Sequence, residues 1–123
     1  LNDLNVHRID HGVRSIEDAM LVQELASRQM PLTVCPLSNI KLCVFGHMRE
    51  HNLLSLLDQG LMVTVNADDP SYFGGYLNDN YHALAAHLPI TDEHIKTLAA
   101  NSFKASFLSE EQKAHWLHCV STY

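Results

Sequence analysis

Five polar side chains stand shortly after three strand-like segments of the sequence, and three of them, a histidine and two aspartates, could bind a metal or transfer a proton. The five are His11 after residues 4–10, Ser38 and Asn39 after residues 30–35, and Asp68 and Asp69 after residues 61–66. Each occupies the C-terminal end of a predicted strand, where the chain enters a loop before a helix. In a barrel of parallel strands those ends meet on one face, and that face carries the active site. A histidine and two carboxylates meeting there could bind a metal ion or carry out proton transfer.

The adjacent carboxylates of Asp68 and Asp69 repel each other, although they directly follow a segment that looks like a buried strand. A divalent cation beside Asp68 would stabilise the ionised pair, and Asp69 could then hydrogen-bond a substrate. The structural alternative is that both aspartates cap the following turn, with Pro70 fixing the backbone. For His11 the alternative is a packed histidine in a tight His-Gly turn. Spacing alone leaves these alternatives open.

The other histidines and the cysteines form weaker patterns. His47 and His51 are four residues apart but lack the HExxH pattern of a zinc site, so a solvated helix face is predicted. His115, His118 and Cys119 cluster on the last predicted helix, where a structural or surface role is expected. The three cysteines form no CxxC pair, which predicts free buried thiols in a reducing compartment.

The elements that would position the candidate residues alternate along the chain. Strands are predicted at 4–10, 30–35 and 61–66, a loop at 36–46, and helices at 15–28, 48–59, 76–88, 91–108 and from Ser109 onward. Ser15 and Thr91 are expected to cap their helices, Gly60 to end one, and Ser109 to form a capping box with Gln112. Alternation of this kind predicts parallel strands joined by helical crossovers.

Three strand–helix units cannot close a barrel by themselves. An eight-unit barrel takes about 250 residues, and the chain has 123. The two outer strands would also expose unpaired backbone edges. The predicted fold class is therefore α/β, with residues 1–123 forming part of a larger parallel unit.

Composition narrows the classes of partner. Hydrophobic residues make up 46% and charged residues 18% of the chain, as in a globular protein. The net charge of −6 argues against a general nucleic-acid or anionic-membrane binder. No apolar run approaches the ~18 residues of a membrane span. Composition therefore favours neither a nucleic acid nor a membrane surface as partner.

Four segments in order along the chain carry a family resemblance. They are RIDHG at 8–12, CPLSN at 35–39, VTVNADDP at 63–70 and NSFKASFL at 101–108. Together they resemble the adenosine/adenine deaminase family of the metal-dependent amidohydrolase superfamily, over nearly the whole chain. Asp10, directly before His11, resembles the adenine deaminase branch, because deaminases that act on adenosine usually have glycine there.

The resemblance implies a (β/α)₈ TIM barrel of which this chain supplies strands six to eight, the C-terminal part of the deaminase domain. It implies one Zn²⁺ ion, held by two histidines of an H-x-H on the first strand, a third histidine on the fifth, and an aspartate that matches Asp68. His11 matches the catalytic histidine that orients and stabilises the attacking hydroxide. Asp69 matches the substrate-binding aspartate that hydrogen-bonds a purine ring nitrogen.

The implied function is zinc-dependent hydrolytic deamination of a small-molecule substrate, adenine, to hypoxanthine and ammonia, a cytoplasmic step of purine salvage. The H-x-H, the third zinc histidine and the family's catalytic glutamate have no match in this chain. The chain is therefore expected to need the N-terminal part of the barrel and to be inactive alone. Two alternatives stay open, namely deamination of adenosine to inosine and a non-catalytic interaction module derived from a barrel.

Overall fold

The computed structural model describes residue 3 and residues 5–123. Its helices, strands and 3₁₀ turns follow in the order β1 (Ile9–Asp10), η1 (Val13–Glu17), α1 (Ala19–Arg28), β2 (Leu32–Val34), α2 (Pro36–Lys41), η2 (Met48–Glu50), α3 (Leu53–Asp58), β3 (Val63–Val65), α4 (Pro70–Phe73), α5 (Leu77–His87), α6 (Asp92–Lys104) and α7 (Glu110–Ser121). The strands form one parallel sheet in the order β1-β2-β3. The predicted α/β class with helical crossovers is confirmed.

The strands are shorter than their predicted ranges. β1 pairs only at Ile9 and Asp10, and Leu4 at the start of the predicted strand lies outside the described residues. The N–H of Ile9 donates to the carbonyl oxygen of Pro31 at 2.9 Å. Proline has no N–H group, so Pro31 cannot donate the next hydrogen bond of the parallel ladder, and the pairing of β1 with β2 stops there.

The first helix begins later than predicted. Ser15 lies inside the 3₁₀ turn η1 and does not cap α1. Asp18 caps the helix instead, because its Oδ1 atom accepts hydrogen bonds from the N–H groups of Met20 and Leu21 at 2.9 and 3.1 Å. The prediction of a Ser15 cap was therefore wrong by three residues.

The segment between β2 and β3 also differs from its prediction. The predicted loop 36–46 contains the helix α2, which Pro36 begins at a position where its fixed φ suits a first helical turn. The single helix predicted at 48–59 is split into η2 and α3, with His51 and Asn52 between them. This break turns His51 into the interior.

Several predicted helix ends are confirmed. Thr91 and Ser109 each accept a hydrogen bond from the backbone N–H three residues later, and Gly60 follows α3 with a left-handed φ of 80°. The helix that Thr91 caps ends at Lys104 rather than near Leu108. None of the helices in the described part of the chain has the length and apolar character needed to cross a bilayer.

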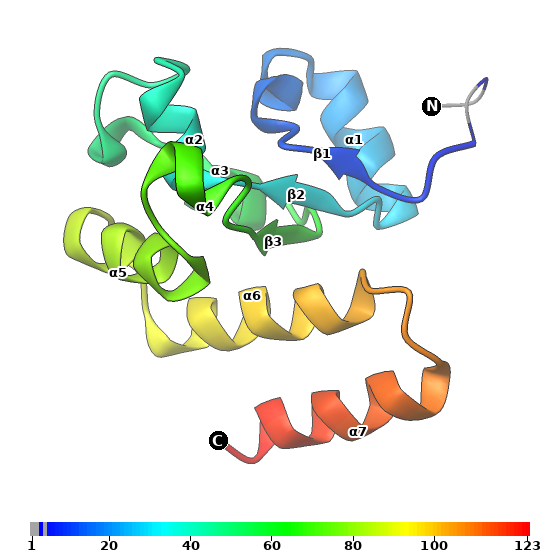
Figure 1. Ribbon diagram of the computed structural model, residues 1–123. Coiled ribbons are helices and arrows are strands. Elements are labelled where there is room, and N and C mark those ends of the chain that lie inside the picture. The colour runs from blue at the N-terminus through cyan, green and yellow to red at the C-terminus, as the bar shows by residue number, and fades with distance from the viewer. Residues whose placement is uncertain (1–2, 4) are drawn as a thin grey trace.

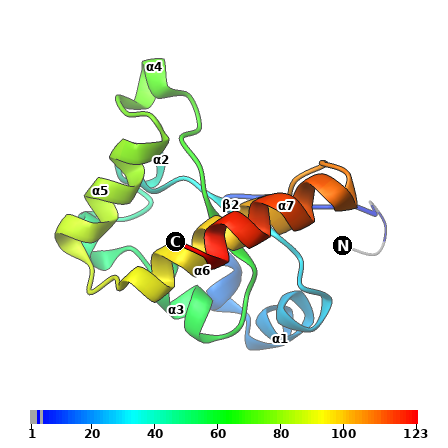
Figure 2. The same cartoon turned by 90° about the horizontal axis from the view of Figure 1, so that it is seen from below.

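The helices cover the sheet in layers. α6 packs on β3, and α7 packs on the outer side of α6 (Figure 1; Figure 2). The core contains fully buried side chains from strands and helices, namely Leu25, Leu32, Val34, Leu53, Leu56, Val63, Leu84 and Leu98. Asn101 of α6 donates from Nδ2 to the carbonyl oxygen of Val63 at 3.0 Å, which fixes the helix against the outer strand.

Candidate active site

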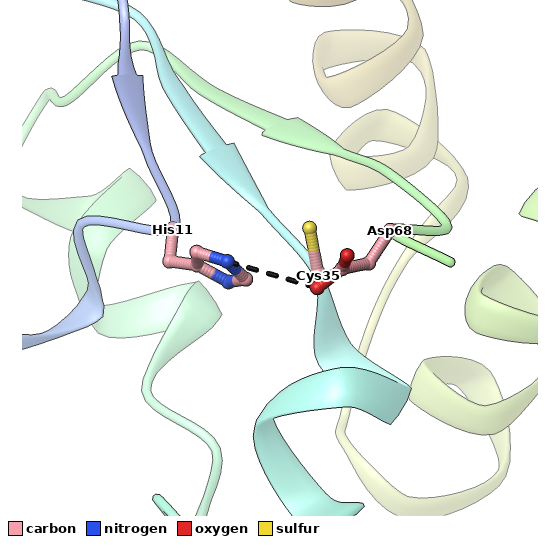
Figure 3. Close-up of side chains that lie close together, drawn as sticks. All are labelled: His11, Cys35 and Asp68. Carbon is pink, nitrogen blue, oxygen red and sulfur yellow. Dashed lines mark ion pairs between the residues drawn. The ribbon is translucent and has the colours of Figure 1, made fainter. Parts of the chain in front are cut away.

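His11 and Asp68 lie together at the C-terminal edge of the sheet. His11 directly follows β1, and Asp68 follows β3. The Nε2 atom of His11 is 3.7 Å from the Oδ2 atom of Asp68, and a dashed line joins the two side chains in Figure 3. The two side chains are 37% and 29% exposed, so both remain open to a ligand.

A left-handed backbone conformation at both residues sets the direction of the His11 and Asp68 side chains. His11 has φ 58° and Asp68 has φ 60°, a region that few residues other than glycine adopt. The N–H of His11 donates to the carbonyl oxygen of Thr33 at 3.0 Å, and Gly12 continues the turn with φ 72°. The chain therefore leaves β1 sharply, and the imidazole points across the strand ends toward Asp68 (Figure 3).

Ser38 holds the Asp68 carboxylate in place. Its Oγ atom donates to Oδ2 of Asp68 at 2.7 Å, and the serine is fully buried. Ser38 reaches this position because α2 begins at Pro36, two residues after the end of β2. The structure thus brings together polar side chains that follow all three strands.

Cys35 is a neighbour of the site that the sequence predicted only as a buried thiol. Its Sγ atom, a ring nitrogen of His11 and a carboxylate oxygen of Asp68 all lie within 4.8 Å of one another (Figure 3). Burial, together with the carboxylates of Asp68 and Asp10, raises the pKa of the Cys35 thiol to about 12. The position of Cys35 at the same strand end as Ser38 was the signal that could have identified it.

Asp69 has a different environment from Asp68. It caps the short helix α4, where its Oδ1 atom accepts a hydrogen bond from the N–H of Tyr72 at 3.1 Å. Of the two aspartates, only Asp69 takes the turn-capping arrangement. Its side chain is exposed, and its Oδ2 atom accepts no hydrogen bond from the residues that the structure describes. One carboxylate oxygen is thus available to a ligand.

A cavity of about 340 Å³ opens beside the cluster, lined by Arg8, Asp10, His11, Thr33, Cys35, Asn66 and Asp68. Asp10 and Thr33 are register partners on β1 and β2, and Oγ1 of Thr33 donates to Oδ1 of Asp10 at 2.9 Å. His11 also lines a second cavity of about 470 Å³, whose walls include Leu21 and Val44. His11 therefore stands between a polar cavity and a largely apolar one.

Asn39 and His51 extend the polar cluster into the interior. The prediction that His51 lies with His47 on a solvated helix face was wrong, because the His51 residue is only 4% exposed. The centroid of its ring lies 4.6 Å from that of the Phe45 ring, and burial lowers the pKa of His51 to about 4. The Asn39 amide lies between the two imidazoles, 3.1 Å from His51 and 3.3 Å from His11. This arrangement was missed from the sequence because the pattern placed His51 inside one unbroken helix.

The remaining candidates lie apart from this site. On α7, Nε2 of His115 is 4.0 Å from Sγ of Cys119, and His118 does not join them in a group of metal-ligand type. All three cysteines are free, but only Cys35 is buried, so the prediction of buried thiols was wrong for the exposed Cys43 and the half-buried Cys119. Among the described residues, the one group of three candidate ligands is the cluster around His11.

Comparison with known proteins agrees with the family resemblance. The family model for adenosine deaminase matches residues 1–123. An adenine deaminase from Acinetobacter baylyi is 61% identical over 121 residues, which are 98% of this chain and 36% of that protein. The crystal structure of an adenine deaminase from Arthrobacter aurescens is 48% identical and superposes with a TM-score of 0.94, over 97% of this chain and 36% of that one.

A more distant amidohydrolase from Burkholderia ambifaria, solved with zinc bound, shares the fold at 22% identity and a TM-score of 0.86, over 97% of this chain and 34% of its own. The chain spans about a third of the length of the proteins that it matches. With a family model matched from the first residue to the last, the chain belongs to the adenosine deaminase family.

Proposed function

We propose that the protein containing this chain deaminates adenine hydrolytically, consuming water and releasing hypoxanthine and ammonia. The observation that carries the proposal is the His11–Ser38–Asp68 cluster, found in a chain 61% identical to an adenine deaminase. Neither adenosine nor a non-catalytic interaction module is favoured by relatives that are themselves named adenine deaminases. Purine salvage in the cytoplasm is the proposed setting, and the free cysteines suit reducing conditions.

We assign the three strands to positions six to eight of an eight-stranded (β/α)₈ barrel, and residues 1–123 to its C-terminal part. The superposition on about a third of a solved adenine deaminase supports this assignment. So does the sheet itself, because parallel strands with helical crossovers are the repeating unit of such a barrel. The rest of the protein would supply the other strands and the far wall of the pocket.

Asp68 is the zinc ligand that we propose within this chain. Its carboxylate is partly exposed, and the bond from Ser38 fixes its orientation, as supporting hydrogen bonds do at metal sites. Carboxylate oxygen and imidazole nitrogen are both donors that zinc accepts, and the relative from Burkholderia ambifaria binds zinc. When bound, zinc supplies the Lewis acidity that makes water nucleophilic at neutral pH. The remaining ligands would come from the rest of the protein.

His11 is the catalytic residue of the proposal. Its Nε2 atom faces the space beside Asp68, where the attacking water must be held. A hydrogen bond from a ring nitrogen at this place orients that water and stabilises the negative charge that develops on its oxygen. The left-handed turn at His11 and Gly12 keeps the ring in this position.

Asp69 is the substrate-binding residue that we propose. Its Oδ1 atom is used in the cap of α4, and its exposed Oδ2 atom can accept a hydrogen bond from the ring N–H of a free purine base. Asp10 lines the neighbouring cavity of about 340 Å³ and is held there by Thr33. The Asp10 side chain takes up space beside His11, and this supports the smaller free base as substrate.

The test is a comparison of adenine and adenosine with the full-length, zinc-loaded protein. We expect kcat/KM for adenine to exceed that for adenosine by at least about 100-fold. A chelator should abolish turnover, and added Zn²⁺ should restore it. Absence of deamination of both compounds with zinc bound would falsify the assignment, and a preference for adenosine would overturn the proposed substrate.

A further inference from the structure

A chain of hydrogen bonds runs from the protein interior to the candidate active site. The N atom of Leu53 lies 3.2 Å from Nδ1 of His51, Nε2 of His51 lies 3.1 Å from Oδ1 of Asn39, and Nδ2 of Asn39 lies 3.3 Å from Nδ1 of His11. Asn39 is 1% and His51 4% exposed, so bulk water cannot replace these partners. Neither residue touches the substrate space in the proposed reaction.

The direction of every hydrogen bond in this chain follows from its inner end. The backbone N–H of Leu53 can only donate, so Nδ1 of His51 must accept. A neutral imidazole carries one proton, which must then be on Nε2 of His51 and be donated to Oδ1 of Asn39. The same amide presents its NH₂ group to His11, and that group can only donate.

His11 receives this donation at Nδ1, so its own proton must be on Nε2. Nε2 is the ring atom that lies 3.7 Å from Oδ2 of Asp68 and faces the polar cavity. A backbone amide at the start of α3 thus determines which nitrogen of a distant imidazole carries the proton. The opposite amide orientation would set the NH₂ group of Asn39 against the N–H of His51.

Packing holds each member of the chain in place. The ring of Phe45 lies 4.6 Å from that of His51, and the N–H of Leu53 needs an acceptor because it begins a helix. The backbone N–H of Asn39 donates to the carbonyl oxygen of Cys35 at 2.9 Å, which anchors Asn39 in α2. Burial lowers the pKa of His51 to about 4, so this ring stays neutral near pH 7.

We propose that His51 and Asn39 are positioning residues that hold His11 as the tautomer protonated on Nε2. In this form His11 can donate a hydrogen bond into the space beside Asp68 but cannot accept one there. The catalytic consequence rests on the proposed deaminase function: His11 acts as a hydrogen-bond donor to the attacking oxygen. Removal of His51 or Asn39 leaves the imidazole free to present a lone pair instead.

The direct test is the ring ¹⁵N spectrum of the full-length protein labelled in its histidines, with the His11 signals assigned by loss in His11→Gln. We expect Nε2 of His11 to be protonated and Nδ1 not. In Asn39→Asp a carboxylate replaces the donating amide, and the His11 proton should move to Nδ1. In His51→Gln, whose side-chain N–H replaces the donor, the proton should stay on Nε2. His82→Phe, at an exposed position of α5, is the control and should leave the His11 signals unchanged.

Kinetics on the same variants give the second measurement. Asn39→Asp and His51→Phe should lower kcat for adenine about 10–100-fold, with a KM change of less than about threefold and with zinc content unchanged. His51→Gln should recover most of the loss. A His11 proton on Nδ1 in the wild type, or one that stays on Nε2 in Asn39→Asp, overturns the proposal. Failure of the deaminase function alone would appear differently, as no turnover in a wild type whose His11 tautomer is as expected.

Discussion

Two residues of the candidate site adopt backbone conformations that most amino acids avoid. His11 and Asp68 have φ of 58° and 60°, and non-glycine residues held in such regions cost of the order of 1–3 kcal/mol each. The surroundings compensate for this cost, since Thr33 accepts from the His11 amide and Ser38 donates to the Asp68 carboxylate. Gln29 and Cys43 also have a positive φ outside the site, so what distinguishes His11 and Asp68 is that two such residues lie side by side.

The two neighbouring aspartates should respond differently to removal. Asp68→Ala in the full-length protein should abolish adenine turnover and lower the zinc content, because it deletes the proposed ligand that Ser38 holds. Asp69→Ala should retain zinc and raise KM for adenine by about tenfold or more. Metal analysis beside steady-state kinetics separates the two variants. Equal zinc loss in both would contradict the assigned division of roles.

His11 should matter for chemistry and not for zinc retention. We expect His11→Ala to slow kcat for adenine about 100-fold or more, since it removes the group that orients the attacking water. The zinc content should remain near one ion per protein chain, because the proposed ligand in this chain is Asp68. A variant that loses its metal would instead identify His11 as a ligand.

Burial of neutral His51 predicts how stability changes with pH. Its pKa in the folded protein is about 4, below the ordinary value of 6.5, so the unfolded chain binds the additional proton between these values. The free energy of unfolding should therefore be highest above pH 6.5 and fall toward pH 4, by up to about 3 kcal/mol from this group. Urea unfolding of the full-length wild type and of His51→Gln between pH 4 and pH 6.5 measures this change in the free energy of unfolding. The variant should lack this part of the pH dependence, and parallel curves would refute the attribution.

At the scale of elements, sequence patterns predicted order and type better than boundaries. Hydrophobic strands and capping hydroxyls are local signals, and those at Thr91 and Ser109 are confirmed. The break in the helix before Leu53 has no local signal, because it depends on the hydrogen bond between His51 and Asn39, which is twelve residues earlier in another element. A helical pattern read alone continues through that position, which is why the inner part of the site was missed.

Two glycines with the same backbone conformation offer a matched pair of element-scale variants. Gly12 has φ 72° and Gly60 has φ 80°, but a Cβ atom at Gly12 would lie 2.7 Å from Cδ2 of the fully buried Leu32, whereas nothing lies within 4 Å at Gly60. Gly60→Ala should cost about 1 kcal/mol and spare activity, since it strains only the turn. Gly12→Ala should cost about 2–4 kcal/mol and lower kcat, because the turn that aims His11 must move. Equal losses of stability, measured by urea unfolding, would refute the steric argument.

At the scale of the whole molecule, the sequence could predict which residues share an edge but not what each one contacts. Parallel strands alone predict that His11, Ser38 and Asp68 gather at one end of the sheet, and they do. The different environments of Asp68 and Asp69 could not be predicted. Only Asp68 has a left-handed φ, and only Asp68 accepts a hydrogen bond from the buried Ser38, which is distant in sequence. Tertiary contacts, and not local sequence, distinguish the two carboxylates.

The sheet itself leads to a prediction about the 123 residues expressed alone. In the described residues no strand pairs with the outer edge of β1 or of β3, although Asn101 covers the carbonyl oxygen of Val63. Open parallel edges recruit further strands, so the isolated chain should self-associate or aggregate. Light scattering after size exclusion measures this, and coexpression with the remainder of the protein should convert the assemblies into a one-to-one complex. A monodisperse monomer with a sharp thermal transition would mean that the helices protect these edges without the rest of the barrel.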